Sequence, residues 1–196
     1  MMHGLINHSF QSFMRDGYGD RAWLEVAARA GVSPPSFEPM LCYEDSITPA
    51  VLDAMALVLR RSRDEVMEDI GTYLVTHPNT EAVRRLLRFG GMNFEDFLHS
   101  LDDLPDRARM AVADLELPAI ELHGHEGGRY SLICESPMPG FGHLMMGVLR
   151  VMADDYGALA VLDLEQIEPG SETVHIQLIE SDYSDGRVFD LGARAS

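Results

Sequence analysis

The sequence has no lysine, only two cysteines, and no apolar run of about 18 residues, the length that a membrane-spanning helix needs. Two thiols, Cys42 and Cys134, are too few for the disulfide framework of a secreted domain, so we expect a reduced, cytoplasmic protein. The first residues also lack the basic stretch and apolar core of a secretion signal. We therefore predict a protein that is neither secreted nor membrane-spanning.

Positive charge is scarce. The 15 basic side chains are all arginines, and they face 32 acidic side chains, which leaves a formal net charge of -17. Repulsion at long range opposes an encounter with the phosphates of nucleic acid or with an anionic lipid surface. We predict that neither nucleic acid nor a membrane is a partner.

The remaining composition is that of a folded protein. Hydrophobic residues make up 46% of the 196 residues and charged residues 24%, unlike a disordered chain. The length fits one domain with a sizeable core. We predict a single domain over residues 1–180, followed by a polar C-terminal tail over residues 181–196.

Apolar residues recur at helical spacing through the first part of the chain. Gly17-Tyr18-Gly19 predicts a turn, Thr48-Pro49 predicts a helix start with Thr48 as its cap, and Asn93 predicts another cap. The spacing predicts helices over Leu5–Met14, Arg21–Ala30, Thr48–Leu59, Arg63–Val75 and Thr80–Phe89, with a further helix after Asn93.

After Pro118 the pattern changes to strands. A glycine-bearing turn at Gly124–Gly128 predicts a hairpin, and Pro169-Gly170 predicts a second one. The predicted elements are strands Ala119–His123 and Tyr130–Glu135, a helix Gly140–Tyr156, and strands Leu159–Ile167 and Thr173–Ile179. Helices followed by this unit predict an α+β fold, a helical N-terminal subdomain followed by a four-stranded antiparallel sheet with packed helices.

Several short motifs occur in a recognisable order. They are His3-Gly4-Leu5-Ile6-Asn7-His8, Tyr18-Gly19 with Trp23, Tyr43-Glu44-Asp45-Ser46, and Phe97-Leu98-His99-Ser100-Leu101-Asp102-Asp103-Leu104. Over residues 2–180 the chain resembles the haem-nitric oxide/oxygen binding (H-NOX) family, which includes the N-terminal domain of soluble guanylate cyclase. The resemblance implies a haem-binding sensor of nitric oxide or oxygen that signals to a partner protein, and it makes the run from Phe97 the start of the family's proximal helix.

The haem ligand that the resemblance implies is missing. In the family, a His directly after an Asn-Leu-Asp-x-Leu run binds the haem iron, and that position here is Pro105. Proline has no side-chain donor atom and cannot ligate iron. Haem is therefore implied by the family and opposed by this residue.

A second haem contact is also changed. The family clamps the haem propionates with Tyr-x-Ser-x-Arg, and the matching positions here are Cys134, Ser136 and Met138, so only the Ser is kept. Met138 cannot replace the charge-assisted fork of an Arg. Pro118 matches a family proline that packs against the haem. The resemblance places these apolar side chains nearest the pocket: Ile6, Phe10, Leu74, Leu101, Leu144 and Met145.

Four other side chains are candidate iron ligands. His8 and His143 lie near the expected pocket edge, whereas His99 would point about 120° away from the ligand position on a continuous helix. Cys134 would need a lowered thiol pKa, which the acidic surroundings, including Glu135, oppose. A buried, unreactive Cys134 is the favoured interpretation.

Other clusters are less specific. His123 and His125 share one face of a strand and could form part of a metal site if a third ligand joined them. The paired acids Asp102-Asp103 and Asp154-Asp155 are expected to be solvated surface charges. No phosphate loop, nucleophile elbow, zinc-protease motif or dinucleotide fingerprint occurs, so we do not expect an enzyme.

Two hypotheses for function remain open. The first is a stand-alone sensor of the bacterial type, which binds haem with degenerate ligation and signals to a histidine kinase or a cyclic-nucleotide enzyme. The second is a haem-less module that keeps the H-NOX fold and regulates a signalling partner.

Overall fold

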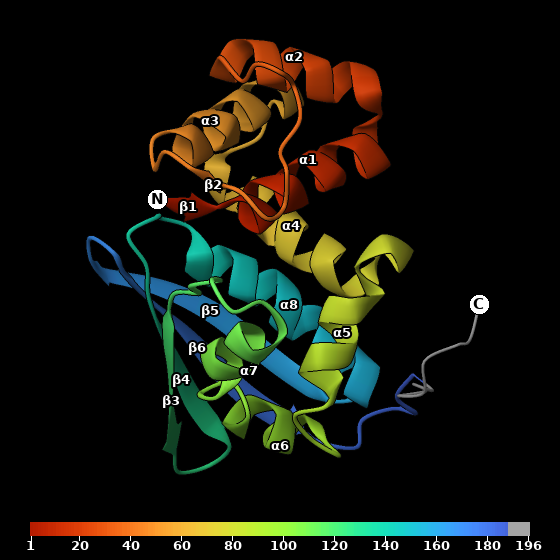
Figure 1. The fold of residues 1–196 in the computed structure, drawn as a ribbon. Helices are drawn as coiled ribbons and strands as arrows, with labels where there is room; N and C mark the ends of the chain where they lie inside the picture. The colour runs from red at the N-terminus through yellow and green to blue at the C-terminus, as the bar shows by residue number, and fades with distance from the viewer. Residues whose placement is uncertain (188–196) are drawn as a thin grey trace.

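The computed structural model describes residues 1–187. Helices form the first part of the chain, as the apolar spacing predicted, and Figure 1 shows α4 between the N-terminal helices and α8. Two short strands, β1 (Met2–His3) and β2 (Cys42–Tyr43), pair at the base of these helices. The helical elements are α1 (Gly4–Tyr18), α2 (Asp20–Ala30), α3 (Ile47–Leu59), α4 (Arg63–Thr76), η1 (Pro78–Thr80), α5 (Glu81–Arg88), α6 (Phe94–His99) and α7 (Leu104–Ala111).

The second part is an antiparallel sheet with one helix between its two hairpins. Its order in space is β3-β4-β6-β5, and every neighbouring pair is antiparallel. The elements are β3 (Ala119–His125), β4 (Arg129–Glu135), α8 (Phe141–Tyr156), β5 (Leu159–Glu168) and β6 (Ser171–Glu180). The predicted α+β fold is confirmed.

The core consists of two apolar clusters. The N-terminal cluster surrounds Trp23 and Met55, and the C-terminal cluster joins α6 and α8 to the inner face of the sheet. Inner-face side chains such as Leu132 and Val174 are fully buried because strand residues alternate between faces. Leu144 of α8 packs against both clusters, so α8 is where they meet.

Two glycines bring α4 and α8 into close contact. A Cβ atom added at Gly71 would lie 2.0 Å from the Leu144 carbonyl oxygen, and one at Gly147 would lie 2.1 Å from the Glu68 carbonyl oxygen. No side chain fits at these distances, so the two helix backbones touch. The contact fixes the N-terminal helices relative to the sheet.

Some local predictions were wrong. Gly17 and Tyr18 lie inside α1, and the chain turns at Gly19, whose φ is +87°. Thr48 does not cap α3, because the helix begins one residue earlier, at Ile47, and the buried Thr48 hydroxyl donates to Asn7 Oδ1 at 2.8 Å. The cap at Asn93 is correct, since its side chain accepts from the Asp96 N–H.

The first hairpin is longer than predicted. Gly124 belongs to β3, which runs to His125, so the turn is shorter than Gly124–Gly128. The turn residues Gly127 and Gly128 both have positive φ, as a tight hairpin turn requires.

The last described residues lie against the body of the protein. The Ser184 N–H donates to the Gly157 carbonyl at 3.0 Å, and the Arg187 N–H donates to the Asp155 carbonyl at 2.9 Å. The rest of the predicted tail, residues 188–196, lies outside the described residues. Within residues 1–187, no helix is both long and apolar enough to cross a bilayer.

Candidate functional site

The side chains expected to line a haem pocket are divided between the two apolar clusters, and Leu144 packs against both. Leu101, Cys134 and Met145 belong to the C-terminal cluster and are at most 2% exposed. The half-buried side chains that pack against the N-terminal cluster are Ile6, Leu74, Met138 and Leu144, and Phe10 belongs to that cluster with 2% exposure. Leu101, Cys134 and Met145 therefore have almost no surface exposed, whereas Ile6, Leu74 and Leu144 keep some.

Pro105 lies in the first turn of α7. The run from Phe97 to Leu104 is not one helix: α6 ends at His99, and α7 begins at Leu104. A proline suits this place because the first N–H groups of a helix have no partner within the helix. Pro105 is half-buried, as is Pro118 just before β3. The helical rotation expected between His99 and Pro105 does not apply, because a turn separates them.

A segment over residues 134–142 includes the positions of the family's propionate clamp. Several of its polar groups form hydrogen bonds within the segment or with residues 170–172. The Ser136 N–H donates to the Gly170 carbonyl at 2.9 Å, and the Ser136 hydroxyl accepts from the Met138 N–H at 3.1 Å. At the start of α8, the carboxylate of Glu172 accepts from Gly140 N at 2.9 Å and from Gly142 N at 2.7 Å. Glu172 comes from β6 and is only 6% exposed.

Sequence reasoning missed Glu172. The strand pattern places it on β6, but nothing local indicates that its carboxylate meets a helix start 30 residues earlier. The position suits an acid, because the free N–H groups at a helix N-terminus favour negative charge. Glu172 therefore supplies a carboxylate to this segment from within the chain.

Cys134 is an unreactive thiol. Burial raises its pKa to about 12, and the nearby carboxylate of Glu172 acts in the same direction. A thiol with this pKa stays protonated near neutral pH and is a poor metal ligand. The acid responsible is Glu172, whereas the sequence pointed to Glu135.

The three candidate histidines lie apart from one another. His8 Nδ1 donates to the Phe37 carbonyl at 3.0 Å. His143 Nε2 lies 3.6 Å from an Asp64 carboxylate oxygen. His99 is exposed and meets the ring of Tyr130 edge to face, with the two ring centres 5.8 Å apart.

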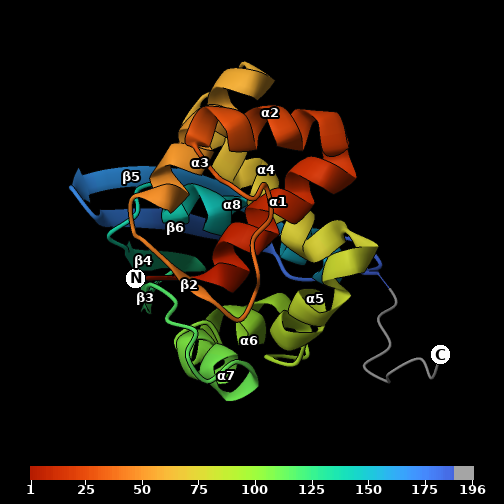
Figure 2. The same ribbon diagram turned by 45° about the horizontal axis from the view of Figure 1, so that its top comes forward.

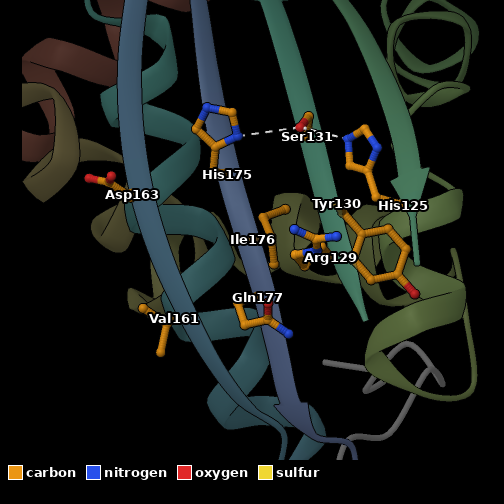
Figure 3. Close-up of a pocket in the computed structure, with 9 residues that line it drawn as sticks. All are labelled: His125, Arg129, Tyr130, Ser131, Val161, Asp163, His175, Ile176 and Gln177. Carbon is orange, nitrogen blue, oxygen red and sulfur yellow. Dashed lines mark hydrogen bonds between the residues drawn. The ribbon is translucent and has the colours of Figure 1, made fainter. Parts of the chain in front are cut away.

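A row of polar side chains crosses the outer face of the sheet (Figure 3). His125 Nε2 and His175 Nδ1 lie 3.0 and 3.3 Å from the Ser131 hydroxyl oxygen, and His175 Nε2 lies 3.2 Å from a Glu165 oxygen. His123 instead meets Glu121 at 2.8 Å. Over residues 1–187, no three His, Cys, Asp or Glu side chains come together as a metal site.

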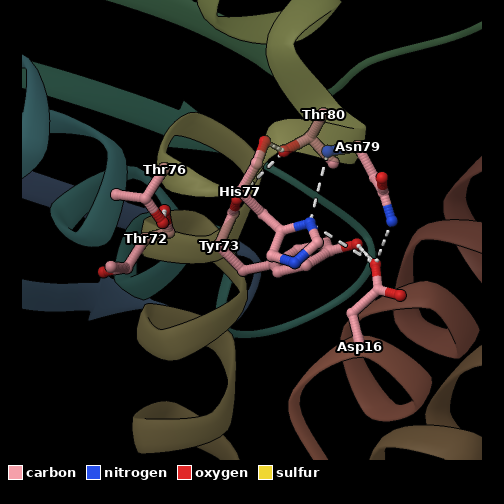
Figure 4. A network of polar contacts seen from close by, with 7 residues as sticks. All are labelled: Asp16, Thr72, Tyr73, Thr76, His77, Asn79 and Thr80. Atoms are coloured by element: carbon pink, nitrogen blue, oxygen red, sulfur yellow. Dashed lines mark hydrogen bonds and ion pairs between the residues drawn. The ribbon is translucent and has the colours of Figure 1, made fainter.

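A second polar network joins the ends of α1 and α4 (Figure 4). The Tyr73 hydroxyl donates to Asp16 Oδ2 at 2.6 Å, and the Asn79 amide donates to the same oxygen at 3.0 Å. The hydrogen bond from Tyr73 is the main reason that the pKa of Asp16 is lowered. The ring of His77 stacks on Tyr73 with its Nδ1 3.5 Å from Asp16. This network fixes α1 against α4.

Comparisons with known proteins agree with the resemblance. Residues 3–161 match the model of the haem-NO-binding family. The chain is 25% identical over 176 residues to soluble guanylate cyclase gcy-31 of Caenorhabditis elegans, which covers 89% of this chain and 25% of that protein. It is 28% identical over 155 residues to gcy-32 of the same organism, covering 78% and 23%. The chain thus spans about a quarter of the length of the curated relatives it matches.

Solved structures share the fold. An Fe(II) unliganded H-NOX protein from K. algicida superposes with a TM-score of 0.79 at 16% identity, covering 94% of this chain and all of the other. An H-NOX protein from S. oneidensis gives a TM-score of 0.76 at 16% identity, covering 92% of this chain and 97% of that one. The arrangement of helices and sheet seen in Figure 2 is therefore the H-NOX arrangement.

Proposed function

Because the chain belongs to the haem-NO-binding family, we propose that it is a regulatory domain that acts on a partner protein without ligating haem as its relatives do. One observation carries the proposal. The segment over residues 134–142, which holds the clamp positions, already carries the buried carboxylate of Glu172 on the N–H groups of Gly140 and Gly142, so a ligand carboxylate would meet a negative group there instead of the family's Arg. The family match supports the regulatory role.

The other positions that the resemblance assigns to haem do not fit the group either. Pro105 offers no donor atom, and the Cys134 thiol is protonated, with a pKa raised to about 12. Met138 has no charge to match a propionate. Leu101 and Met145 have almost no exposed surface left for a flat ligand to cover. The proposed regulatory function therefore does not depend on bound haem.

The partner class rests on the relatives. Curated relatives carry the name soluble guanylate cyclase, so a cyclic-nucleotide enzyme is one proposed partner. A histidine kinase is the other, and it rests on the family resemblance of the sequence alone. Regulation requires that the partner bind one shape of the domain better than another. A stand-alone domain over residues 1–180 and a cytoplasmic location stay predictions, as does the lack of catalytic activity.

A haem-binding sensor is the second candidate. It is favoured by the half-buried side chains Ile6, Leu74 and Leu144, which keep some exposed surface that a flat ligand could cover. In that case His8, His99 or His143 would replace the missing ligand. The two candidates differ in one measurable property, which is stoichiometric haem binding.

A haemin titration followed by absorption separates them. We expect the wild-type protein to show only the broad spectrum of free haemin. The informative variant is Pro105→His combined with Cys134→Tyr and Met138→Arg, which restores all three family contacts. Met110→His is its matched control, because it adds an imidazole to the same helix at a side chain that is 82% exposed.

If the triple variant folds and still gives no sharp Soret band, the site is closed and the proposal stands. A sharp band in the triple variant alone means that the site kept its shape and lost only its ligands, and the wild-type protein is again haem-less. A stoichiometric band in the wild-type protein overturns the proposal. Single alanine variants of His8, His99 and His143 would then identify the ligand.

The regulatory part is tested on a partner. Autophosphorylation of a histidine kinase, or product formation by a cyclase from the same cell, is measured with and without the domain. An effect that nitric oxide does not change supports the proposal, whereas an effect that depends on nitric oxide contradicts it.

A further inference from the structure

Asp155 is a buried carboxylate, although the sequence predicted that it would be a solvated surface charge. Its side chain has no exposed surface, while the neighbouring Asp154 is exposed. Asp155 lies in the last turn of α8, where the negative end of the helix dipole makes an unpaired acid unfavourable. A carboxylate at this place needs cationic partners, because a buried charge without them is strongly destabilising.

Two arginines from different segments supply that charge. Arg84 of α5 donates from Nε to Asp155 Oδ2 at 2.7 Å. Arg187, from the segment after β6, places Nη1 3.6 Å from Oδ1. Oδ1 is buried and accepts no hydrogen bond within the described residues, so the contact to Arg187 is the looser of the two.

The segment over residues 181–187 also touches the end of α8 through its backbone. Its N–H groups at Ser184 and Arg187 donate to carbonyls of Gly157 and Asp155. A Cβ atom added at Gly157 would lie 2.1 Å from the Ser184 carbonyl oxygen, so the two backbones are in direct contact. This segment can therefore leave α8 only by breaking both the backbone bonds and the ion pair.

On its other side, α5 is attached to α7. Arg107 of α7 donates from Nη1 to the Leu86 carbonyl of α5 at 3.1 Å and from Nη2 to the Ser100 carbonyl at 2.8 Å. Arg88, one turn after Arg84, lies 4.0 Å from the centre of the Tyr156 ring beside Asp155. Its Nη1 also donates to the Asp155 carbonyl at 3.4 Å. Arginine side chains thus connect α7 to α5, and α5 to the end of α8, where the last described residues are bound.

We infer that Asp155 is a charge latch, which couples release of the 181–187 segment to movement of α5 and α7. Arg84, whose Nε lies 2.7 Å from Oδ2, is the tight arm of this latch, and Arg187, whose Nη1 lies 3.6 Å from Oδ1, is the loose arm. When Arg187 leaves, the Asp155 carboxylate keeps only its ion pair with Arg84, and the attachment of α5 weakens. In the reverse direction, a shift of α7 moves α5 through Arg107 and withdraws Arg84 from the shared carboxylate.

The use of this latch in signalling rests on the regulatory function proposed above, but its test needs neither haem nor a partner. The helix that it reaches begins at Pro105, the position of the family's iron ligand. A domain that lacks the iron ligand at position 105 would still connect α7 to the 181–187 segment through the contacts of Arg107, Arg84 and Asp155. If the latch fails while the partner assay succeeds, only the transmission route is wrong.

Hydrogen exchange measured by mass spectrometry tests the latch in the full chain. The main variant is Asp155→Asn, which keeps the shape and removes the charge. We expect peptides over residues 181–187 and 81–88 to exchange at least about tenfold faster, since a broken buried ion pair changes an opening equilibrium by more than that factor. Asp154→Asn is the matched control, and it should change neither peptide.

Two further variants decide whether the coupling exists. Arg187→Gln removes the loose arm at a side chain that is 59% exposed, so it should fold even if Asp155→Asn does not. It should accelerate exchange in residues 81–88, with which Arg187 forms no hydrogen bond or ion pair within the described part of the chain. Arg107→Gln should accelerate exchange in residues 181–187 from the opposite end.

The peptide over β4, residues 129–135, reports global unfolding and should stay unchanged. Faster exchange in residues 181–187 alone, with residues 81–88 and α7 unaffected by Asp155→Asn and Arg187→Gln, would reduce Asp155 to a simple anchor and overturn the inference. An unchanged 181–187 peptide in Arg107→Gln would overturn it as well.

Discussion

Replacing Glu172 with Gln removes a charge without changing the shape of the side chain, and it tests whether this acid completes the start of α8. The carboxylate accepts two backbone N–H groups, at 2.9 and 2.7 Å, while it is 6% exposed. A hydrogen bond to a charged group contributes about 1.5–3 kcal/mol. The amide of Gln can accept only one of the two N–H groups and turns a donor toward the other.

The variant therefore loses one charge-assisted bond and leaves one buried N–H without a partner, and the remaining bond becomes neutral. We expect the free energy of unfolding to fall by about 3 kcal/mol. For a chain of this size, about 2–4 °C is lost per kcal/mol, which predicts a Tm lowered by roughly 6–12 °C.

Thermal and denaturant unfolding measure this change. Glu168→Gln is the matched control, since Glu168 is exposed at the end of β5 and its replacement should change the stability by less than about 0.5 kcal/mol. Equal Tm values for the two variants would refute the assignment of Glu172 as an internal partner for α8. The proposed function would then lose the observation on which it rests, the buried carboxylate of Glu172 bound to the 134–142 segment.

Three further results follow from buried groups and close contacts. In the native protein a thiol reagent should modify the exposed Cys42 and leave Cys134 unmodified, because Cys134 is buried and its pKa is raised to about 12. Both thiols should react after denaturation. Burial raises the pKa of Tyr130 to about 12 as well, so the unfolded chain releases both protons at a lower pH than the folded protein does. The free energy of unfolding is therefore highest below the unfolded-state pKa values and falls between about pH 9 and 12, and denaturation midpoints that stay constant over this range would contradict both shifts. Gly147→Ala should lower the free energy of unfolding by about 3 kcal/mol, because its Cβ would lie 2.1 Å from a backbone oxygen of α4. In the same assay Gly17→Ala should raise the free energy of unfolding by about 0.5–1 kcal/mol, because a Cβ at Gly17 has no atom within 4 Å.

Sequence periodicity was sufficient for the elements of this fold. Apolar spacing in α2 and the alternation of β4 are local signals, and the structure confirms both elements. Errors arose where a tertiary contact outweighs a local preference. Thr48 looks like a helix cap because Pro49 follows it, but its hydroxyl is buried against Asn7, and no local pattern records that contact over 41 residues.

For the candidate site, the burial of apolar side chains could be predicted, while their role at a haem stays a prediction. Leu101 and Met145 could be placed by the resemblance, and the structure puts both in the C-terminal cluster. The polar groups could not be placed in the same way. An acid in an acidic sequence gives no sign of burial, so Glu172 was overlooked and Asp155 was misjudged as solvated. Both have partners far away in sequence, at distances of 30 and 71 residues.

The same contacts suggest how a chain with a net charge of -17 uses a few of its acids. Asp16 joins α1 to α4, Glu172 joins β6 to α8, and Asp155 joins α8 to α5. Each acid is met by donors from another element, so each fixes two elements relative to one another. Glu172 and Asp155 do so while buried, at a desolvation cost that the exposed Asp16 does not carry. Glu172 has a further consequence, because it places a negative group in the segment that holds the clamp positions Cys134, Ser136 and Met138. An acid of the chain itself therefore completes the start of α8, and the shape of the domain depends on internal contacts of this kind, those of Asp155 among them.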